Sequence, residues 1–216
     1  PLWITTDETN LYVVDSKNSL IRKIVISTGV VTTLAGTGSS GSSNGTGTSA
    51  SFNQPSGITT DGTNLFLAEH NNNLIRKIVI STGVVTTLAG TGSSGSANGT
   101  GTSASFNNPY GITTDGTNLY VGDTFNHLIR KIVISTGVVT TLAGTGSSGS
   151  ANGTGTSASF YKPYRITTDG TNLYVGDTVN NLIRKIVISS REVTTRAGTG
   201  SSGTANGTGT TARRNK

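Results

Sequence analysis

An acidic residue and an arginine recur seven positions apart, four times along the 216-residue chain. The pairs are Asp15 and Arg22, Glu69 and Arg76, Asp123 and Arg130, and Asp177 and Arg184. If each pair spans two neighbouring strands of a hairpin, both side chains lie on one face, a diagonal step apart and within reach of a long side chain. The spacing predicts an ion pair inside each hairpin, and a charged ring for a ligand is the alternative.

Histidine is too scarce for most metal chemistry, which needs clustered His, Cys, Asp or Glu ligands. The chain has two histidines, His70 and His127, at different repeat positions, and it has no cysteine. Its Gly-rich segments lack the Lys-Ser/Thr ending and following helix of a phosphate loop. Nothing singles out one serine for a Ser–His–Asp arrangement. We therefore expect a protein that is not an enzyme, with no catalytic residues, metal or cofactor.

The whole chain consists of four repeats of 54 residues, namely 1–54, 55–108, 109–162 and 163–216. Residues 74–106 recur without change as residues 128–160. A fixed period of this length indicates a repeat architecture, in which each unit buries its apolar face against its neighbours. The 30 glycines, the many Ser and Thr residues and the sparse charge suit short strands and turns better than helices.

Each repeat opens at a proline and contains four predicted strands. In the first repeat these are residues 4–7, 10–14, 20–27 and 30–35, separated by turn-forming and loop residues. A Gly/Ser/Thr/Asn tract follows and resembles a flexible linker. Within it, Phe52, Phe106 and Phe160 keep one distance from the next proline. This constant position predicts an aromatic side chain that fills a groove between neighbouring units.

Four short antiparallel strands per repeat predict an all-β fold, a single-domain β-propeller of four four-stranded blades. A β-solenoid is the alternative. The blades would form a closed four-bladed ring or part of a larger ring, or separate chains would associate to complete one. Cutting at each proline gives whole blades, so no strand from one terminus is expected to complete a blade at the other, and closure would rest on packing between the first and fourth blades. Asp7, Asp61, Asp115 and Asp169 end the first strands, where they would cap the adjacent turns or ring a cation; capping is the prediction.

One family is similar to these repeats. Residues 121–132 resemble the NHL repeat and include the triplet Asn126-His127-Leu128, and residues 106–115 resemble that family's blade entry. The resemblance covers all four repeats, with the full triplet in the third. It implies a propeller, most often of six blades, that serves as a protein-binding, RNA-binding, sensor or lyase domain. NHL-type lyases place several histidines around the channel, a set that this chain cannot supply.

Four of the positions at which the fourth repeat departs from the others lie in its third turn, outer strand and return segment. Arg191, Glu192, Arg196 and Arg214 replace Gly29, Val30, Leu34 and Phe52. These changes suit a polar terminal cap or drift at the end of a duplicated array. They predict that the outer strand of this repeat is the least ordered.

The repeats differ mainly in two connections, the entry to the first strand and the loop between the second and third strands. In an up-and-down blade both connections lie at the same end, so the differences gather on one face of the disc. We call it the variable-loop face. Its candidate binding residues are Trp3, Lys17, His70, Asn71, Tyr110, Phe125, His127, Tyr161, Tyr164 and Val179. Exposed aromatic residues with polar neighbours are typical of a binding surface, although loops also drift faster than strands.

Charge and hydropathy narrow the choice of partner. The net charge of +6 comes mostly from the fourth repeat, which carries +5, so a nucleic acid partner is not expected. No apolar run approaches the roughly 20 residues of a membrane span, so membrane insertion is not expected. The chain begins at Pro1, as a mature product, an excised piece or an incomplete sequence would. An extracellular or cell-surface location is favoured, but no residue pattern determines the compartment.

The preferred function is non-catalytic binding or scaffolding, with a protein or other macromolecular partner on the variable-loop face. A homo-oligomer that completes a ring is a further possibility. The alternatives are a lyase-like NHL enzyme, an RNA-binding propeller, and an amplified repeat fragment without selected activity.

Overall fold

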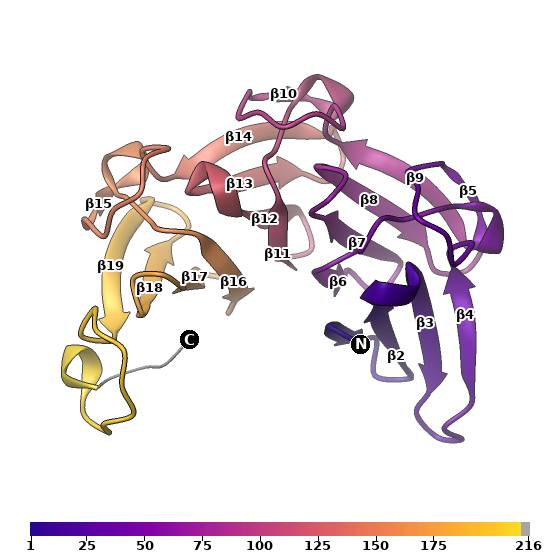
Figure 1. Cartoon of the computed structure of the whole chain (residues 1–216), viewed down its shortest axis with the longest axis horizontal. Coiled ribbons are helices and arrows are strands. Elements are labelled where there is room, and N and C mark those ends of the chain that lie inside the picture. Colours follow the sequence, from indigo (N-terminus) through magenta and orange to yellow (C-terminus); the bar gives the residue numbers. More distant parts are fainter. Residues whose placement is uncertain (213–216) are drawn as a thin grey trace.

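The computed structural model describes residues 1–212, which form four antiparallel blades around a common axis (Figure 1). The first blade contains β1 (Trp3–Thr6), β2 (Asn10–Asp15), β3 (Leu20–Val25) and β4 (Val31–Ala35). The second contains β6 (Ile58–Thr60), β7 (Asn64–Glu69), β8 (Leu74–Val79) and β9 (Val84–Ala89). The third contains β11 (Pro109–Thr114), β12 (Asn118–Asp123), β13 (Leu128–Val133) and β14 (Val138–Ala143). The fourth contains β16 (Pro163–Thr168), β17 (Asn172–Asp177), β18 (Leu182–Val187) and β19 (Glu192–Ala197).

Short 3-10 helical turns lie in the connections between strands. Two of them, η1 (Ser16–Asn18) and η4 (Thr124–Asn126), lie between the second and third strands of their blades. The others follow the outer strands: η2 (Gly47–Ser49), η3 (Gly101–Ser103), η5 (Gly155–Ser157) and η6 (Gly209–Thr211). The predicted four-stranded blades are confirmed, with strand ends within two residues of expectation in the first repeat. No helix in the described part is long and apolar enough to cross a membrane.

The Gly-rich tract contributes a fifth strand that the sequence did not predict. Three two-residue strands, β5 (Gly45–Thr46), β10 (Gly99–Thr100) and β15 (Gly153–Thr154), each join the outer edge of the following blade. In the second blade, for example, Gly45 pairs with Val85 and Thr46 with Val84. Consecutive repeats therefore share a strand, while among the described residues no strand from one terminus completes a blade at the other. Two residues, one of them Gly, within a Gly-rich tract are too weak a signal to predict a strand, and the edge of the next blade makes this segment a strand.

An apolar cluster fills each of the three interfaces between consecutive blades. Between the first and second blades it joins Tyr12 and Ile21 of one sheet to Leu65 and Ile78 of the next. The predicted groove-filling role of the phenylalanines is confirmed, because Phe52, Phe106 and Phe160 are fully buried in successive clusters. Arg214, the corresponding residue of the last repeat, lies outside the described residues.

The aspartates at the ends of the first strands cap turns, as predicted. Asp61 Oδ1 accepts hydrogen bonds from the backbone N–H groups of Thr63 (2.9 Å) and Asn64 (2.6 Å). Asp7 does the same in the first blade and also accepts from the Tyr12 hydroxyl at 2.7 Å. Although burial opposes ionisation, these hydrogen bonds lower the pKa of Asp7 to about 2. The carboxylates are therefore committed to their own turns.

The hairpin between the third and fourth strands needs a left-handed residue. Gly29, Gly83 and Gly137 have φ near 70°, and Arg191 adopts the same conformation with φ 61°. A residue with a Cβ is strained there. The strand β19 nevertheless forms and pairs with β18 in the same register as in the other blades. That β19 is the least ordered of the outer strands stays a prediction, which amide hydrogen exchange can test.

The first and fourth blades do not pack as the internal blades do. Each internal interface has its own apolar cluster, and within residues 1–212 no such cluster joins the fourth blade to the first. Ile4 is 53% exposed, whereas its counterpart Ile58 is 1% exposed. Figure 1 shows these two blades at the two ends of the arrangement. At the axis they meet through the Arg165 guanidinium, 4.4 Å from the Trp3 ring centre.

Candidate binding surface on the variable-loop face

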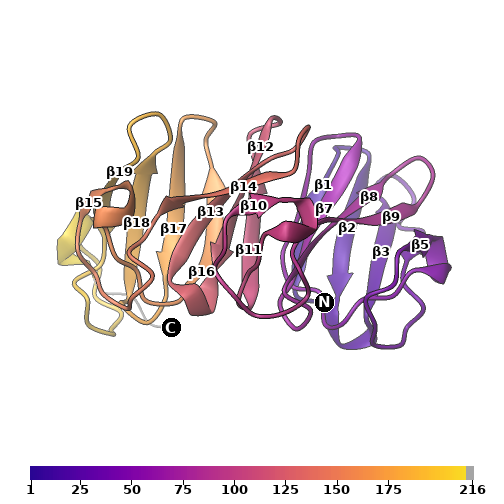
Figure 2. The ribbon, with the colours of Figure 1, turned by 90° about the horizontal axis from the view of Figure 1, so that it is seen from above.

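In each blade, the segment that leads into the first strand and the loop between the second and third strands lie at the same end, as predicted. Their backbones contact directly: the Phe125 N–H donates to the Asn107 carbonyl at 3.1 Å, and the Val179 N–H donates to the Tyr161 carbonyl at 3.2 Å. Figure 2, seen from above the view of Figure 1, shows the blades as upright sheets with connections at both ends. The segments in which the repeats differ therefore form one surface.

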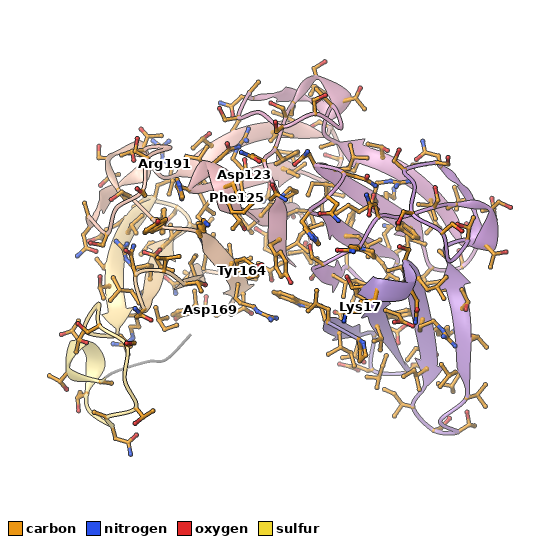
Figure 3. The ribbon with its side chains drawn as sticks, viewed as in Figure 1. Lys17, Asp123, Phe125, Tyr164, Asp169 and Arg191 are labelled. Carbon is orange, nitrogen blue, oxygen red and sulfur yellow. The ribbon has the colours of Figure 1, made fainter. Side chains whose placement is uncertain are left out.

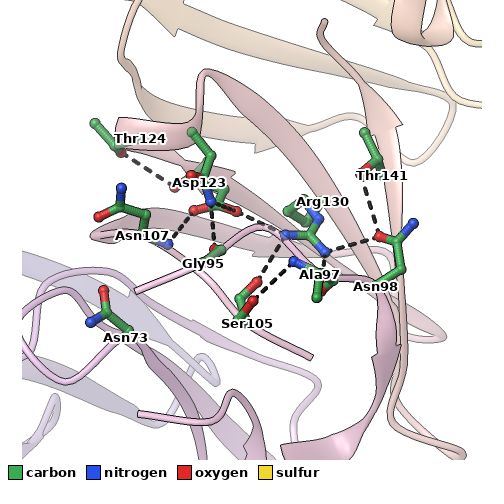
Figure 4. Close-up of polar contacts among 12 residues, drawn as sticks. Asn73, Gly95, Ala97, Asn98, Ser105, Asn107, Asp123, Thr124, Arg130 and Thr141 are labelled. Carbon is green, nitrogen blue, oxygen red and sulfur yellow. Dashed lines mark hydrogen bonds and ion pairs between the residues drawn. The ribbon is translucent and has the colours of Figure 1, made fainter. Parts of the chain in front are cut away.

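A buried ion pair holds this surface in place, and the intrablade pair predicted from spacing is confirmed (Figure 4). Arg130 Nη1 lies 2.9 Å from Asp123 Oδ2, and both side chains are fully buried. Asp123 also accepts from the Asn107 N–H at 2.8 Å and from the Asn126 side chain at 2.9 Å. The carboxylate thus joins the repeat entry to the loop of its own blade.

The arginine of each internal pair also binds the preceding Gly-rich segment. Arg130 Nη1 donates to the Ser105 carbonyl, and Nη2 donates to the Ala97 carbonyl and to Asn98 Oδ1, at 2.9–3.0 Å. Burial raises the pKa of Asp123, and the Asn107 N–H, the Asn126 amide and the Arg130 guanidinium oppose that rise. The ion pairs are structural, and they make an apparent linker into an ordered part of the fold.

Four aromatic rings gather near the axis on the variable-loop face. We call Trp3, His70, Tyr110 and Tyr164 the axial aromatic group; each comes from a different blade. The rings of Tyr110 and Tyr164 are 3.9 Å apart between centroids, and His70 and Trp3 lie 5.4 Å and 6.5 Å from Tyr110. Burial, then the neighbouring Tyr164, raises the pKa of Tyr110 to about 12, so its hydroxyl stays protonated at neutral pH.

Three members of the axial aromatic group, His70, Tyr110 and Tyr164, line a cavity of about 700 Å³. Its lining includes Asp15, Lys17, Gln54, His70, Tyr110 and Tyr164. Lys17 and Tyr164 reach it from the first and fourth blades (Figure 3). A concave site that combines aromatic side chains with a few polar and charged groups is a typical ligand site.

The other predicted residues lie farther out. His127 and Tyr161 contact each other with ring centroids 5.4 Å apart, and Lys162 Nζ lies 4.6 Å from the Phe125 ring centre. Phe125 is 45% exposed. Val179 is half-buried beside Tyr161, and Asn71 is exposed and pairs weakly with Asn53 at 3.5 Å. The structure thus brings five predicted residues together at the axis and leaves the other five as a peripheral strip.

His127 has a structural contact that its place in the NHL triplet did not reveal. It adopts a left-handed conformation with φ 58°, and its Nδ1 accepts from the Lys162 N–H at 3.1 Å. Asn73, at the same position of the second repeat, accepts from the Asn108 N–H at 2.8 Å. The residue therefore ends the loop and fixes the entry of the next repeat.

Two further residues of this region were missed, Leu2 and Arg165. Leu2 lines the cavity at the position of Ser56, Tyr110 and Tyr164. Arg165 stands where Gly57 and Gly111 lie close to the backbone of a following blade, which leaves no room for a Cβ. The sequence signal for Arg165 was that Arg replaces Gly in the last repeat. This replacement is possible because no following blade packs there among the described residues.

We expect His127 to make folding stability depend on pH. Burial, then the charge of Lys162, lowers the pKa of His127 below its ordinary value. The unfolded chain then binds this proton at higher pH than the folded chain, so stability is full above about pH 6.5 and falls as pH drops through the folded pKa. His127→Asn, which copies Asn73, should keep stability at pH 7.5 and reduce the loss at pH 5 in urea titrations. An unchanged pH dependence would contradict this assignment.

Comparison with known proteins identifies relatives of this chain. No family model matches the chain. NHL repeat-containing protein 2 of Bos taurus is 32% identical over 160 residues, which is 67% of this chain and 22% of that protein. The chloroplastic protein SUPPRESSOR OF QUENCHING 1 of Arabidopsis thaliana is 33% identical over 178 residues, covering 76% and 17%. The chain thus spans about a fifth of the length of these relatives.

Solved structures share the fold at lower identity. A protein of unknown function from Bacteroides thetaiotaomicron matches with a TM-score of 0.65 and 24% identity, over 89% of this chain and 45% of that one. Virginiamycin B lyase from Staphylococcus aureus matches with a TM-score of 0.56 and 17% identity, over 89% and 53%. Sequence relatives, repeat motif and blade architecture agree, and the chain belongs to the NHL-repeat family of β-propellers.

Proposed function

We propose that this propeller binds a protein partner through the variable-loop face, with the axial aromatic group as the centre of contact and without catalysis. The observation that carries the proposal is the convergence of Trp3, His70, Tyr110 and Tyr164, one from each blade, the last three of which line a cavity of about 700 Å³. These side chains stand at positions where the repeats differ, while the buried framework around them repeats.

The chemistry of the surface fits a protein partner. Aromatic side chains bury large areas on contact and dominate interface energetics. The surrounding Lys17, Asp15 and Gln54 provide a polar rim. Within residues 1–212, no three His, Asp or Glu side chains come together as metal ligands. We therefore propose that the partner is recognised through the shape of the surface, its aromatic side chains and the charged groups of its rim.

The second repeat shows a substitution that removes an aromatic side chain from this position without disrupting the fold. Ser56 occupies the position of Tyr110 and Tyr164 and is fully buried, with its hydroxyl donating to the Ala68 carbonyl at 2.9 Å. Serine is therefore already compatible with this position. We expect the triple variant Tyr110→Ser, Phe125→Ser and Tyr164→Ser to keep the far-UV circular dichroism of the parent chain.

A displayed peptide library can test the binding role without a known partner. Peptides selected on the unmodified chain should bind the triple-serine variant at least tenfold more weakly, about 1.4 kcal/mol or more. Thr117→Ala, in an exposed turn at the opposite end of the third blade, is the control and should leave binding unchanged. Equal binding to the triple variant, or no enrichment on the unmodified chain, would overturn the proposal.

A further inference from the structure

Between the third and fourth blades, the loop that follows β12 meets the residues that lead into β16. Phe125 and His127 come from that loop, and Tyr161 and Lys162 come from the entry to β16. We call these four residues the junction cluster. The second and third repeats differ at ten of their 54 positions, and four of the ten are these. At the preceding junction the corresponding residues are Asn71, Asn73, Asn107 and Asn108. The same fold therefore carries four asparagines at one junction and two rings, an imidazole and an ammonium at the next.

Backbone contacts hold the junction cluster between two internal blades. The Tyr161 N–H donates to Asp177 Oδ1 at 2.7 Å, and the Tyr161 carbonyl accepts from the Val179 N–H at 3.2 Å, so this residue is tied to the fourth blade. The Lys162 N–H donates to Nδ1 of His127 in the third blade at 3.1 Å. The four side chains therefore project from an ordered framework within the repeat array.

The rings of the junction cluster are open to solvent and lie beside its nitrogen groups. Phe125 and Tyr161 are 45% and 36% exposed. Lys162 Nζ lies 4.6 Å from the Phe125 ring centre, and the His127 ring meets the Tyr161 ring edge-on with centroids 5.4 Å apart. Figure 3 shows Phe125 on the third blade. The cluster thus combines an exposed apolar surface with two nitrogen-bearing side chains.

Both nitrogen-bearing side chains offer hydrogen-bond donors. Because His127 Nδ1 accepts from the Lys162 N–H, the neutral imidazole carries its proton on Nε2. Burial, then the charge of Lys162, lowers the pKa of His127, so the imidazole stays neutral at pH 7 and the ammonium lies close to it. An Nε2–H donor and an ammonium group therefore stand side by side.

The charge of Lys162 has no counter-charge within residues 1–212. The four ion pairs of these residues all join an arginine to an aspartate or glutamate. Asp177, whose charge raises the pKa of His127, is fully buried and accepts from the Tyr161 N–H, from the Asn180 side chain at 2.8 Å and from Arg184 at 3.0 Å. This carboxylate is committed to the framework, which leaves the surface of the cluster complementary to an anion.

We propose that the junction cluster binds an acidic side chain, Asp or Glu, of the protein partner. The carboxylate accepts from Lys162 Nζ and from the His127 Nε2–H, and apolar neighbours of the acidic residue pack on the Phe125 and Tyr161 rings. This inference rests on the proposed function and adds the chemistry of one contact on the same face. One ammonium and one neutral imidazole match a single carboxylate, whereas a nucleic acid needs a track of phosphate contacts.

The preceding junction supplies a matched variant. The junction variant carries Phe125→Asn, His127→Asn, Tyr161→Asn and Lys162→Asn, and so copies residues already present in the second repeat. There Asn73 accepts from the Asn108 N–H at 2.8 Å, as His127 accepts from Lys162, and the Asn107 N–H donates to Asp123 at 2.8 Å, as Tyr161 donates to Asp177. We therefore expect an unchanged fold by far-UV circular dichroism. Lys162→Met is the narrower variant, which removes the charge and keeps an unbranched side chain.

A displayed peptide library, selected on the unmodified chain with the junction variant in excess in solution, reports the preference of the cluster. Peptides that survive this competition should carry Asp or Glu next to an apolar residue. Replacing that Glu by Gln in the peptide, or Lys162 by Met in the protein, should each weaken binding about tenfold in calorimetric titrations. The two changes together should cost little more than either alone, because they remove the same contact. Added salt should weaken binding to the unmodified chain and leave binding to Lys162→Met unchanged.

The variant Tyr110→Ser/Tyr164→Ser separates this inference from the proposed function, because it alters the axial aromatic group and keeps the junction cluster. Peptides that lose affinity for this variant but bind Lys162→Met as tightly as the parent would overturn the present inference alone. So would peptides enriched only without the competitor, or survivors that lack an acidic residue. An oligouridine that binds the parent and is lost with Lys162→Met would assign the cluster to nucleic acid instead. No enrichment on the unmodified chain would overturn both proposals.

Discussion

Arg130→Ala is expected to lower the free energy of unfolding by about 3–5 kcal/mol, because it leaves the fully buried Asp123 carboxylate without its charged partner. The change also removes donors from the Ser105 and Ala97 carbonyls and from Asn98. The loss should therefore extend beyond the third blade to the Gly-rich segment that precedes it. Chemical denaturation followed by far-UV circular dichroism measures the effect.

The chain contains a matched control at the same repeat position. Arg22 lies 3.9 Å from Asp15, and both side chains are partly exposed. Arg22→Ala should cost no more than about 1 kcal/mol, as exposed ion pairs do. If both alanine variants lost the same stability, burial and the return-segment contacts would not be what makes the internal pairs matter.

Phe106→Ala is expected to destabilise the protein by about 3–5 kcal/mol, because it opens a cavity in a close-packed interface. The Phe106 side chain is fully buried in the cluster between the second and third blades, with the Arg130 guanidinium 5.2 Å from its ring centre. Its removal weakens the packing between these blades and the aromatic support of the arginine together. The same denaturation experiment reports the loss.

Phe125→Ala provides the comparison with an exposed aromatic residue. Phe125 is 45% exposed on the variable-loop face, and removing it should change stability by no more than about 0.5 kcal/mol. This pair of variants separates the structural phenylalanines from those available for binding. A small effect at Phe106 would show that the interface relaxes around the missing ring.

Local pattern and the four-fold repeat were sufficient to predict much of the fold. The β-branched strands, the Asp-capped turns and the constant position of Phe52 each depend on a few neighbouring residues or on the period. The Asp–Arg spacing predicted the ion pairs because a diagonal step across a hairpin is a short-range relation. The variable-loop face followed from the antiparallel order of the strands alone.

The fifth strand of the second, third and fourth blades and the role of the Gly-rich tract could not be predicted in this way. Gly45 and Thr46 form a segment of only two residues within a Gly-rich tract, and they become a strand because the next blade offers an unpaired edge. Likewise, the second role of Arg76, binding Ser43 and Asn44 of the preceding repeat, depends on contacts more than 30 residues apart in sequence.

The candidate site shows the same division. Residue type and repeat position predicted which side chains differ between copies, because those properties are visible along the chain. Which of them meet at the axis, such as Tyr110 with Tyr164, was determined by the packing of separate blades, and so was the capping contact of His127. Likewise, Val31 is 50% exposed whereas Val85 and Val139 are 1% exposed, so packing and not residue type decides the exposure of this position.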